Sequence, residues 1–461
     1  MPARTVHLFP GLGAYSTGAL RQARADHPEV TATFRVLDDV AVARGLPEVS
    51  GALFGAHAPS LGELLEQPAE VLQLAIFGVS VATHEVLLRL GGEPDLLLGH
   101  SFGEMAALVA AGAFDLADGA QLVCARCAAL RDWEGRGMMA AIGTHEAAAR
   151  HLAGLLDEPG LVVGCHNAPR QSVLSGPVPA IDRAERVAGA LELPYARLQL
   201  PYASHHPAMR PAVPVFRELM DGVRQRQLRL PVYSPIHHRH YTDEDDLKQE
   251  LAECLVLPVD FVRAARDLHA RGYTRFVEAG ALNALTRCVE LTVPGVEVAA
   301  PLVDPDRELA GLHAAAGVAP ERSPQVPRPR DPRPADGAAT VVAPAAGPEP
   351  AEPVRQADTV SPEPPEQARA NGHPPRETVL AELRQMYAEA LEYPTDVLTA
   401  DAMLEAELGV DSLKQTSLLS RVVDRFGMTG ERDRVRVWEL PTLGHIADYV
   451  AERSGRREAV S

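Results

Sequence analysis

A proline-rich segment in the last third of the chain constrains the possible folds more than any other feature. Residues 320–375 contain 15 of the chain's 39 prolines and almost no large apolar side chains. Such a segment cannot bury a hydrophobic core, and proline favours the extended polyproline II conformation. We therefore predict a disordered, flexible linker over residues 319–375, able to reach about 170 Å at roughly 3.1 Å per residue. It would separate one unit over residues 1–318 from a second over residues 376–455.

The first unit alternates expected strands and helices, which is typical of an α/β fold. The segments "TVHLF", "DLLLG" and "TRFVEAG" are expected strands, and the second runs directly into an alanine-rich helix, "HSFGEMAALVAAGAF". Between residues 132 and 199 the order is strand, helix, strand, strand, helix, strand. This order predicts an inserted ferredoxin-like subdomain.

The second unit has a purely helical pattern. Apolar residues recur at spacings of three and four in "ETVLAELRQMYAEAL", and "SLKQTSLLSRVVDRF" and "PTLGHIADYVAER" are further helices, the last with Pro441 and Thr442 expected in its first turn. About eighty residues with three or four helices predict a small all-α bundle, which we expect to contain four helices.

Composition excludes several classes of partner and location. The net charge of −18 argues against nucleic acid and anionic membranes. The longest uninterrupted apolar runs, such as "LVVGC" and "LLLG", are too short to cross a bilayer, and the N-terminal residues do not resemble a signal peptide. Five scattered cysteines suit free thiols in a reducing cytoplasm. Cys124 and Cys127 form a lone CxxC, which favours small buried helix residues over a metal or redox site.

The segment "GHSFG", residues 99–103, places a serine between an expected strand and an expected helix. Glycines permit a tight turn that would expose the Ser101 hydroxyl, and the following helix N-terminus would offer N–H groups to an oxyanion. A serine that only caps the helix is the alternative. The strand before it and the helix after it favour a nucleophile.

Several motifs in one order make a more specific pattern: "FPGLG", "GHSFGE", "LVCARC", "GMMAAIG", "HNAPRQSVLSG", "YASHHPAM" and "FVEAG". This series resembles the malonyl-CoA:acyl carrier protein transacylases and the acyltransferase domains of polyketide synthases over residues 5 to about 300. The resemblance implies a hydrolase-like core, with the small subdomain over the cleft. It also implies that Ser101 is the nucleophile and that His205 is its general base. In this family the position of His206 usually holds a small or polar residue, so we expect His206 to have only a supporting role.

The same resemblance assigns Arg126 to the free carboxylate of a malonyl-type substrate, because a guanidinium binds a carboxylate through two hydrogen bonds. A surface ion pair is the alternative, but the neighbours of Arg126 are apolar. Backbone N–H groups of Leu12 and Phe102 would hold the oxyanion. A backbone carbonyl near Asn283 would orient the histidine. The resemblance also implies a set of pocket residues: Gln73, Asn167, Tyr202 and Ser204.

The residues before His205 and the residue after Ser101 give conflicting indications of which acyl group is carried. The tetrapeptide Tyr202-Ala203-Ser204-His205 is associated in this family with methylmalonyl. Phe102, beside the serine, fits the malonyl type better. We therefore predict a malonyl-type substrate carried by CoA and leave malonyl and methylmalonyl open.

The segment "LGVDSLK", residues 408–414, resembles the attachment motif of acyl carrier proteins. It implies that Ser412 carries 4′-phosphopantetheine added by a separate phosphopantetheinyl transferase, since a helix N-terminus favours a phosphodiester. A capping serine is the alternative. Residues 377–411 contain nine acids and one base, Arg384, which suits docking to basic partner enzymes.

Together these features predict an acyltransferase–carrier didomain of polyketide-type biosynthesis that works with a ketosynthase on another protein. The alternatives are an acyl-carrier hydrolase, which should not need Arg126, and an inactive carrier or scaffold. A true α/β-hydrolase esterase would need an acid between the serine and a late histidine, and no residue of this chain is a convincing candidate for it. "HHRH", His237–His240, is interpreted as a polar loop, and no metal is expected.

Overall fold

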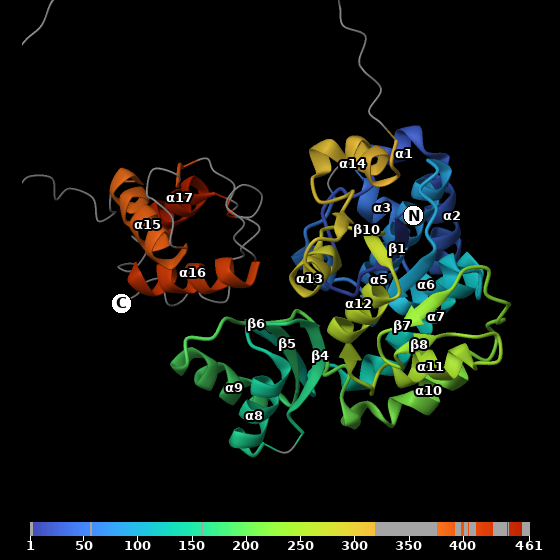
Figure 1. The fold of residues 1–461 in the computed structure, drawn as a ribbon, viewed down its shortest axis with the longest axis horizontal. Helices are drawn as coiled ribbons and strands as arrows, with labels where there is room; N and C mark the ends of the chain where they lie inside the picture. Colours follow the sequence, from blue (N-terminus) through green and yellow to red (C-terminus); the bar gives the residue numbers. More distant parts are fainter. Residues whose placement is uncertain are drawn as a thin grey trace, which may run out of the picture. The chain divides into compact units, whose positions relative to one another are not determined.

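The computed structural model describes residues 3–55, 58–158, 160–318, 376–391, 398–400, 404, 412–426, 440 and 442–453. The predicted linker at 319–375 lies outside these residues. One folded part lies before it in the chain and another after it (Figure 1).

A six-stranded sheet forms the centre of the first unit, in the order β11-β10-β1-β2-β7-β8. Its strands are parallel except for β8, which runs antiparallel to β7. Strands β1 and β2 are almost completely buried, as expected of a parallel sheet covered on both faces. The bounds are β1 Arg4–Phe9, β2 Leu96–Gly99, β7 Val232–Ser234, β8 Arg239–His240, β10 Tyr273–Glu278 and β11 Glu297–Ala299.

Helices surround this sheet, and the long helix α5 runs through the hydrophobic core (Figure 1). The α-helices are α1 Ala23–Asp26, α2 Pro28–Ala43, α3 Val49–Phe54, α4 Leu61–Leu65, α5 Ala69–Arg89, α6 Gly103–Ala110, α7 Leu116–Leu130, α10 Ala212–Leu219, α11 Leu247–Glu253, α12 Phe261–Ala270, α13 Ala284–Thr292 and α14 Glu308–Ala315. Short 3-10 turns are η1 Arg131–Trp133, η2 Pro207–Met209 and η3 Pro305–Arg307.

Helix α5 corrects the expectation that every apolar segment is too short for a bilayer. Its 21 residues include an 18-residue window of mean hydropathy 1.7, long and apolar enough to span a membrane, but 89% of that window is buried inside the protein. Single polar residues, among them Gln73, Ser80 and His84, interrupt the apolar residues of α5, so an uninterrupted apolar run does not reveal its length. A helix that is apolar on nearly all sides is typical of a protein core.

The second sheet is formed largely by the segment predicted as a subdomain. Its elements follow the order β3, α8, β4, β5, α9, β6, and its strand order is β6-β3-β5-β4-β9. Strand β9 comes from outside the segment and pairs parallel to β4, which the sequence did not indicate. The bounds are β3 Met138–Ile142, α8 Glu146–Leu156, β4 Val162–Ala168, β5 Gln171–Gly176, α9 Val178–Ala190, β6 Tyr195–Arg197 and β9 Val259–Asp260.

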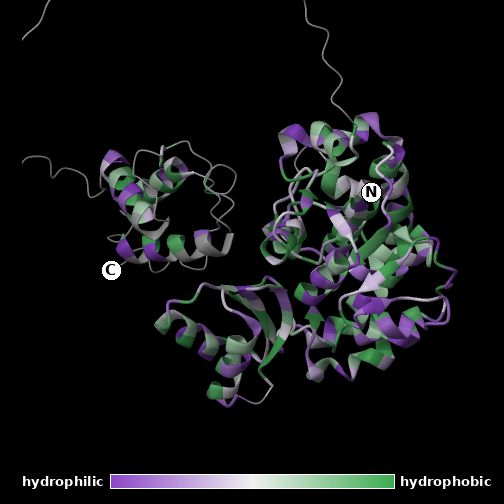
Figure 2. Cartoon of the chain, viewed as in Figure 1, coloured by the Kyte–Doolittle hydropathy of each residue, from purple (hydrophilic) through white to green (hydrophobic). Residues whose placement is uncertain are grey.

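The two faces of this sheet have different partners because side chains alternate along each strand. In β3, Ala140 and Ile142 pack with α8 and α9, whereas Met139 and Ala141 join the cluster that contains Leu98 of the central sheet. Figure 2 shows hydrophobic residues along these strands. The second sheet is therefore attached to the central sheet through a shared core.

Residues after the linker form three helices within the described ranges: α15 Arg376–Leu391, α16 Ser412–Arg425 and α17 Leu443–Arg453. Helix α15 packs against α17. Arg425 of α16 pairs with Glu382 of α15 at 3.3 Å. Thr442 precedes α17 and accepts a hydrogen bond from the His445 N–H. The fourth predicted helix and Pro441 lie outside the described residues.

Candidate active site

Ser101 lies in the turn between β2 and α6. Its φ of 55° is in the left-handed region, which side chains other than glycine rarely adopt. The glycines two residues away on each side are sterically required: a Cβ on Gly99 would lie 2.5 Å from the Glu104 Cα, and one on Gly103 would overlap the Phe9 carbonyl oxygen. The turn is therefore held against the end of β1 with the serine at its apex.

His205 lies beside this serine. Its Nε2 is 2.6 Å from Ser101 Oγ, and its Nδ1 is 2.8 Å from the Leu257 carbonyl oxygen. Because a carbonyl only accepts, Nδ1 carries the proton and Nε2 can accept one from the serine. Burial lowers the pKa of His205 to about 4, and the hydrogen bond to Leu257 acts in the opposite direction. The imidazole is thus neutral at physiological pH.

The carbonyl that orients His205 is not the one that the sequence predicted. The expected group near Asn283 is engaged elsewhere, because the Asn283 carbonyl accepts hydrogen bonds from Thr286 Oγ1 and the Arg287 N–H at the start of α13. Leu257 supplies the carbonyl instead. The sequence could not single it out, since a backbone group leaves no trace in the side chain.

Arg126 projects from α7 into the same region and is 5% exposed. Its Nη1 donates to Gln73 Oε1 at 3.0 Å and to the Tyr202 hydroxyl at 3.1 Å. Burial acts to lower its pKa, but the contacts with Tyr202 and nearby thiols raise it overall. Within the described residues, no Asp or Glu forms an ion pair with it. A buried cation without a carboxylate partner is costly, and a bound carboxylate would relieve that cost.

A narrow cavity connects these groups. It measures about 10 Å³, room for one small atom group. Ser204 borders it with a buried hydroxyl that has no partner among the described residues. The lining is Ser101, Phe102, Met105, Arg126, Ser204, His205, Phe216, Leu251, Cys254 and Leu255. Cys254 was not predicted, and no sequence signal marked it.

The remaining predicted residues occupy different places. Among the described residues, Asn167 of β4 forms no hydrogen bond with Ser101 or His205; its Oδ1 accepts from His100 Nε2 at 2.8 Å, beside the nucleophile turn. Leu12 lies in the loop after β1, where a Cβ added to the preceding Gly11 would lie 3.3 Å from the His100 carbonyl oxygen. In the described structure, neither the Leu12 nor the Phe102 N–H donates to protein. Both donors are thus available.

Two other sequence features have structural explanations. Cys124 and Cys127 are free, buried thiols on α7, which confirms their interpretation as small helix residues, and burial raises the pKa of Cys124 to about 11. In the histidine-rich segment, His237 pairs with Glu250 at 2.6 Å. Among the residues described, no group of three His, Cys, Asp or Glu side chains is placed to hold a metal ion. The expectation of a metal-free protein stays a prediction.

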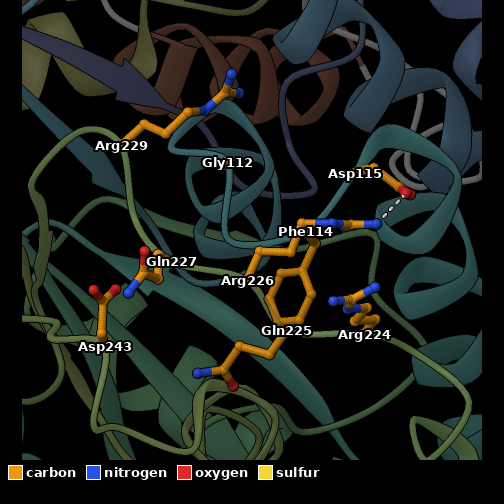
Figure 3. Close-up of a pocket in the computed structure, with 9 residues that line it drawn as sticks. All are labelled: Gly112, Phe114, Asp115, Arg224, Gln225, Arg226, Gln227, Arg229 and Asp243. Atoms are coloured by element: carbon orange, nitrogen blue, oxygen red, sulfur yellow. Dashed lines mark hydrogen bonds and ion pairs between the residues drawn. The ribbon is translucent and has the colours of Figure 1, made fainter.

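A larger open groove of about 770 Å³ lies elsewhere (Figure 3). Ser101 precedes α6, whereas Gly112 of the groove follows the other end of that helix. In the groove Arg226 pairs with Asp115 at 2.6 Å. Its lining is Gly112, Phe114, Asp115, Arg224, Gln225, Arg226, Gln227, Arg229 and Asp243, none of which borders the cavity at Ser101.

In the second unit, helix α16 begins at Ser412. This is the position that the attachment motif predicts, at the start of a 14-residue helix. The free N–H groups of such a terminus suit a phosphodiester. The preceding residue, Asp411, lies outside the described residues.

A serine–histidine pair at a strand-to-helix turn, facing a buried arginine on an α/β core, is characteristic of acyl-transferring enzymes. Comparison with known proteins identifies the group. The chain belongs to the acyl transferase domain family, whose model matches residues 23–317. A second model, the phosphopantetheine attachment site, matches residues 381–450. The latter match implies a carrier domain with covalently attached 4′-phosphopantetheine.

Individual relatives agree with this assignment. The chain is 30% identical over 292 residues to a phenolphthiocerol/phthiocerol polyketide synthase protein of Mycobacterium tuberculosis, a match that covers 63% of this chain but only 18% of that protein. Among solved structures, the acyltransferase domain from the second module of the salinomycin polyketide synthase has a TM-score of 0.60 at 28% identity, covering 68% of this chain and 72% of that one. The malonyl CoA-acyl carrier protein transacylase of Coxiella burnetii has a TM-score of 0.61 at 26% identity, with 68% and 99% covered.

Proposed function

We propose that this protein transfers a malonyl-type group from CoA to a phosphopantetheine thiol through an acyl-enzyme on Ser101. The observation that carries the proposal is the 2.6 Å contact between Ser101 Oγ and His205 Nε2, with Nδ1 fixed by the Leu257 carbonyl. This arrangement leaves the lone pair of Nε2 directed at the serine hydroxyl. A neutral histidine so placed is a competent general base.

The proton follows a simple path in this mechanism. Ser101 Oγ attacks the thioester carbonyl while His205 Nε2 accepts the hydroxyl proton, and the Leu12 and Phe102 N–H groups stabilise the oxyanion. The bond to the CoA sulfur then breaks, and His205 returns the proton to the departing thiolate. In the second half, His205 takes the proton of the acceptor thiol as the sulfur attacks the Ser101 ester carbonyl. The bond from that carbonyl to Ser101 Oγ then breaks, and His205 returns the proton to Oγ.

Arg126 supports a dicarboxylic substrate. It is buried, charged and without an acidic partner among the described residues, so a substrate carboxylate would supply the missing negative charge. The name of the Coxiella burnetii transacylase, a malonyl enzyme, supports the same substrate class.

The acceptor would be the chain's own carrier. Ser412 at the start of α16 would hold the 4′-phosphopantetheine arm, with the helix N-terminus favouring its phosphate. When attached, this arm supplies the thiol that receives the acyl group. A separate phosphopantetheinyl transferase would attach it, and a ketosynthase on another protein would use the product, in the cytoplasm.

The strand order of the second sheet supports a ferredoxin-like subdomain. We propose that the chain divides into an acyltransferase domain at 1–318, a linker at 319–375 and a carrier domain at 376–455.

Intact-protein mass spectrometry of the pantetheinylated full chain tests this function. Malonyl-, methylmalonyl- and acetyl-CoA are offered in competition, and we expect the dicarboxylic groups to load Ser412 in preference to acetyl. The Ser101→Ala variant should not load, and Ser412→Ala should stop at an acyl-enzyme. Release of free acid without loading would indicate a hydrolase, and absence of any Ser101 adduct would indicate an inactive scaffold.

Loading within one molecule is tested by dilution. The first-order rate of Ser412 loading should stay constant when the protein is diluted tenfold at saturating acyl-CoA. A mixture of pantetheinylated Ser101→Ala with Ser412→Ala provides the intermolecular comparison. If that mixture loads at the wild-type rate, Ser412 is acylated by the acyltransferase domain of another molecule.

A further inference from the structure

The loop that carries the general base has a strained backbone. His205 has a φ of 57°, in the left-handed region that costs energy for any residue with a Cβ. The N–H groups of His205 and His206 both point to the Leu255 carbonyl, at 2.8 and 3.3 Å. Such a conformation persists only where the surroundings hold it in place.

The side chain of His206 supplies part of this support. It is 4% exposed, its Nδ1 accepts from the Ala208 N–H at 3.0 Å, and its Nε2 donates to the Gly160 carbonyl. Both ring nitrogens are therefore used, in one tautomer. The first bond caps the turn η2, and the second leaves the loop and reaches the segment between α8 and β4.

The second sheet contacts the same loop at neighbouring points. Ser175 Oγ of β5 donates to the Ser204 carbonyl at 2.7 Å. At the Gly164 position of β4, a Cβ would lie 3.3 Å from the Cβ of His205 itself. The residues on both sides of the base are thus bonded to β5 and to the segment that leads into β4, while Ser101 lies in the turn that follows β2 of the central sheet. The relative position of nucleophile and base depends on both sheets.

We propose that His206 is a positioning residue for His205: it bonds the loop of the general base to Gly160, in the segment that leads into β4 of the second sheet, and so sets the distance from His205 to Ser101. The proposal rests on the proposed role of His205 as base. A small hydroxyl residue at 206 could still cap η2, but its side chain is too short to reach the Gly160 carbonyl. The two bonds of His206 can therefore be separated by substitution.

The test measures single-turnover acylation of Ser101 by malonyl-CoA in the full chain. His206→Ser keeps a cap and loses the Gly160 bond; His206→Gln offers an amide donor of nearly equal reach. We expect His206→Ser to slow acylation at saturating substrate at least tenfold, in line with the sensitivity of catalysis to displacements of about 1 Å. Substrate affinity should change little, and His206→Gln should recover part of the rate.

The pH profile separates positioning from a structural role. A loosened His205 is better solvated, so the acid limb of acylation should move to higher pH in His206→Ser. The exposed His151 of α8 provides a matched control, His151→Ser, which should behave as wild type. An unchanged rate and pH profile in His206→Ser, or a loss that only follows its unfolded fraction, would overturn the proposal. If wild type forms no Ser101 adduct, the proposed function fails first, which the same spectra reveal.

Discussion

The hydroxyl of Tyr202 lies 3.1 Å from Nη1 of Arg126 and accepts its hydrogen bond. The first residue of the Tyr202–His205 tetrapeptide thus contacts the predicted carboxylate-binding group directly. Gln73 completes the arrangement, since its Oε1 accepts from the same Nη1 at 3.0 Å. With Nη1 engaged by two neutral acceptors, the other guanidinium N–H groups remain for a substrate.

Removing the Tyr202 hydroxyl should weaken substrate recognition without abolishing catalysis. In Tyr202→Phe, Nη1 of Arg126 keeps only its hydrogen bond to Gln73, so the guanidinium gains rotational freedom. We expect kcat/KM for malonyl-CoA to fall about 5- to 10-fold, the effect of one buried hydrogen bond. Steady-state transfer to the carrier measures this change. Tyr195→Phe, whose hydroxyl bonds the Ile181 carbonyl in the second sheet, provides a tyrosine control that should retain wild-type kinetics.

Replacing Arg126 should change selectivity as well as rate. Arg126→Ala removes the only predicted partner of the substrate carboxylate, so kcat/KM for malonyl-CoA should fall by a factor of about 10²–10³, corresponding to lost charge-assisted hydrogen bonds. The kcat/KM for acetyl-CoA should fall much less, because acetyl has no free carboxylate for Arg126 to bind. Competitive loading followed by mass spectrometry gives the ratio, with Arg150→Ala, an exposed arginine paired with Glu146, as control. An unaltered malonyl-to-acetyl ratio would contradict the assignment.

The pH dependence of acylation should reflect the lowered pKa of His205. The base must be neutral to accept the serine proton, and its pKa lies near 4 rather than near the ordinary 6.5. The rate constant kcat/KM for Ser101 acylation should therefore stay level from pH 7.5 to about 5.5 and decline toward pH 4. Stopped-flow acylation with circular dichroism at each pH separates this decline from unfolding. An acid limb centred between 6 and 7 is the contrary outcome.

A buried histidine pair in the core should make folding sensitive to acid. His7 Nδ1 and His84 Nδ1 are 3.0 Å apart. Burial lowers the pKa of His84 to about 4 and that of His7 well below its usual value. Between pH 6.5 and 4 the unfolded chain binds protons that the folded chain does not. The free energy of unfolding should therefore decrease as pH falls through that window, by roughly 3 kcal/mol for His84.

Urea unfolding at several pH values tests this expectation. The variant His84→Gln keeps an amide near His7 but cannot titrate, so its stability should fall less between pH 6.5 and 4.5 than that of wild type. His151→Gln, an exposed histidine on α8, should leave the pH dependence unaltered. Equal slopes for wild type and His84→Gln would show that the pair does not titrate as its burial predicts.

The sequence by itself determined the features whose causes are local. The turn at Ser101 depends on Gly99 and Gly103, two residues away on each side, and the periodicity of residues 412–425 defines a helix that begins at Ser412. The order of elements from β3 to β6 was predicted because strand and helix periods differ within a few residues. These signals need no knowledge of distant contacts.

Only the tertiary structure decided the contacts between distant segments. The carbonyl that orients His205 belongs to Leu257, the acceptors of Arg126 come from α5 and the tetrapeptide, and His206 bonds the Gly160 carbonyl. Backbone groups are the same in every residue, so no residue type marks which carbonyl will meet an imidazole. Such pairings arise only when separate elements pack, which is why motifs could suggest candidate residues such as Ser101 and His205 but could not identify their hydrogen-bond partners.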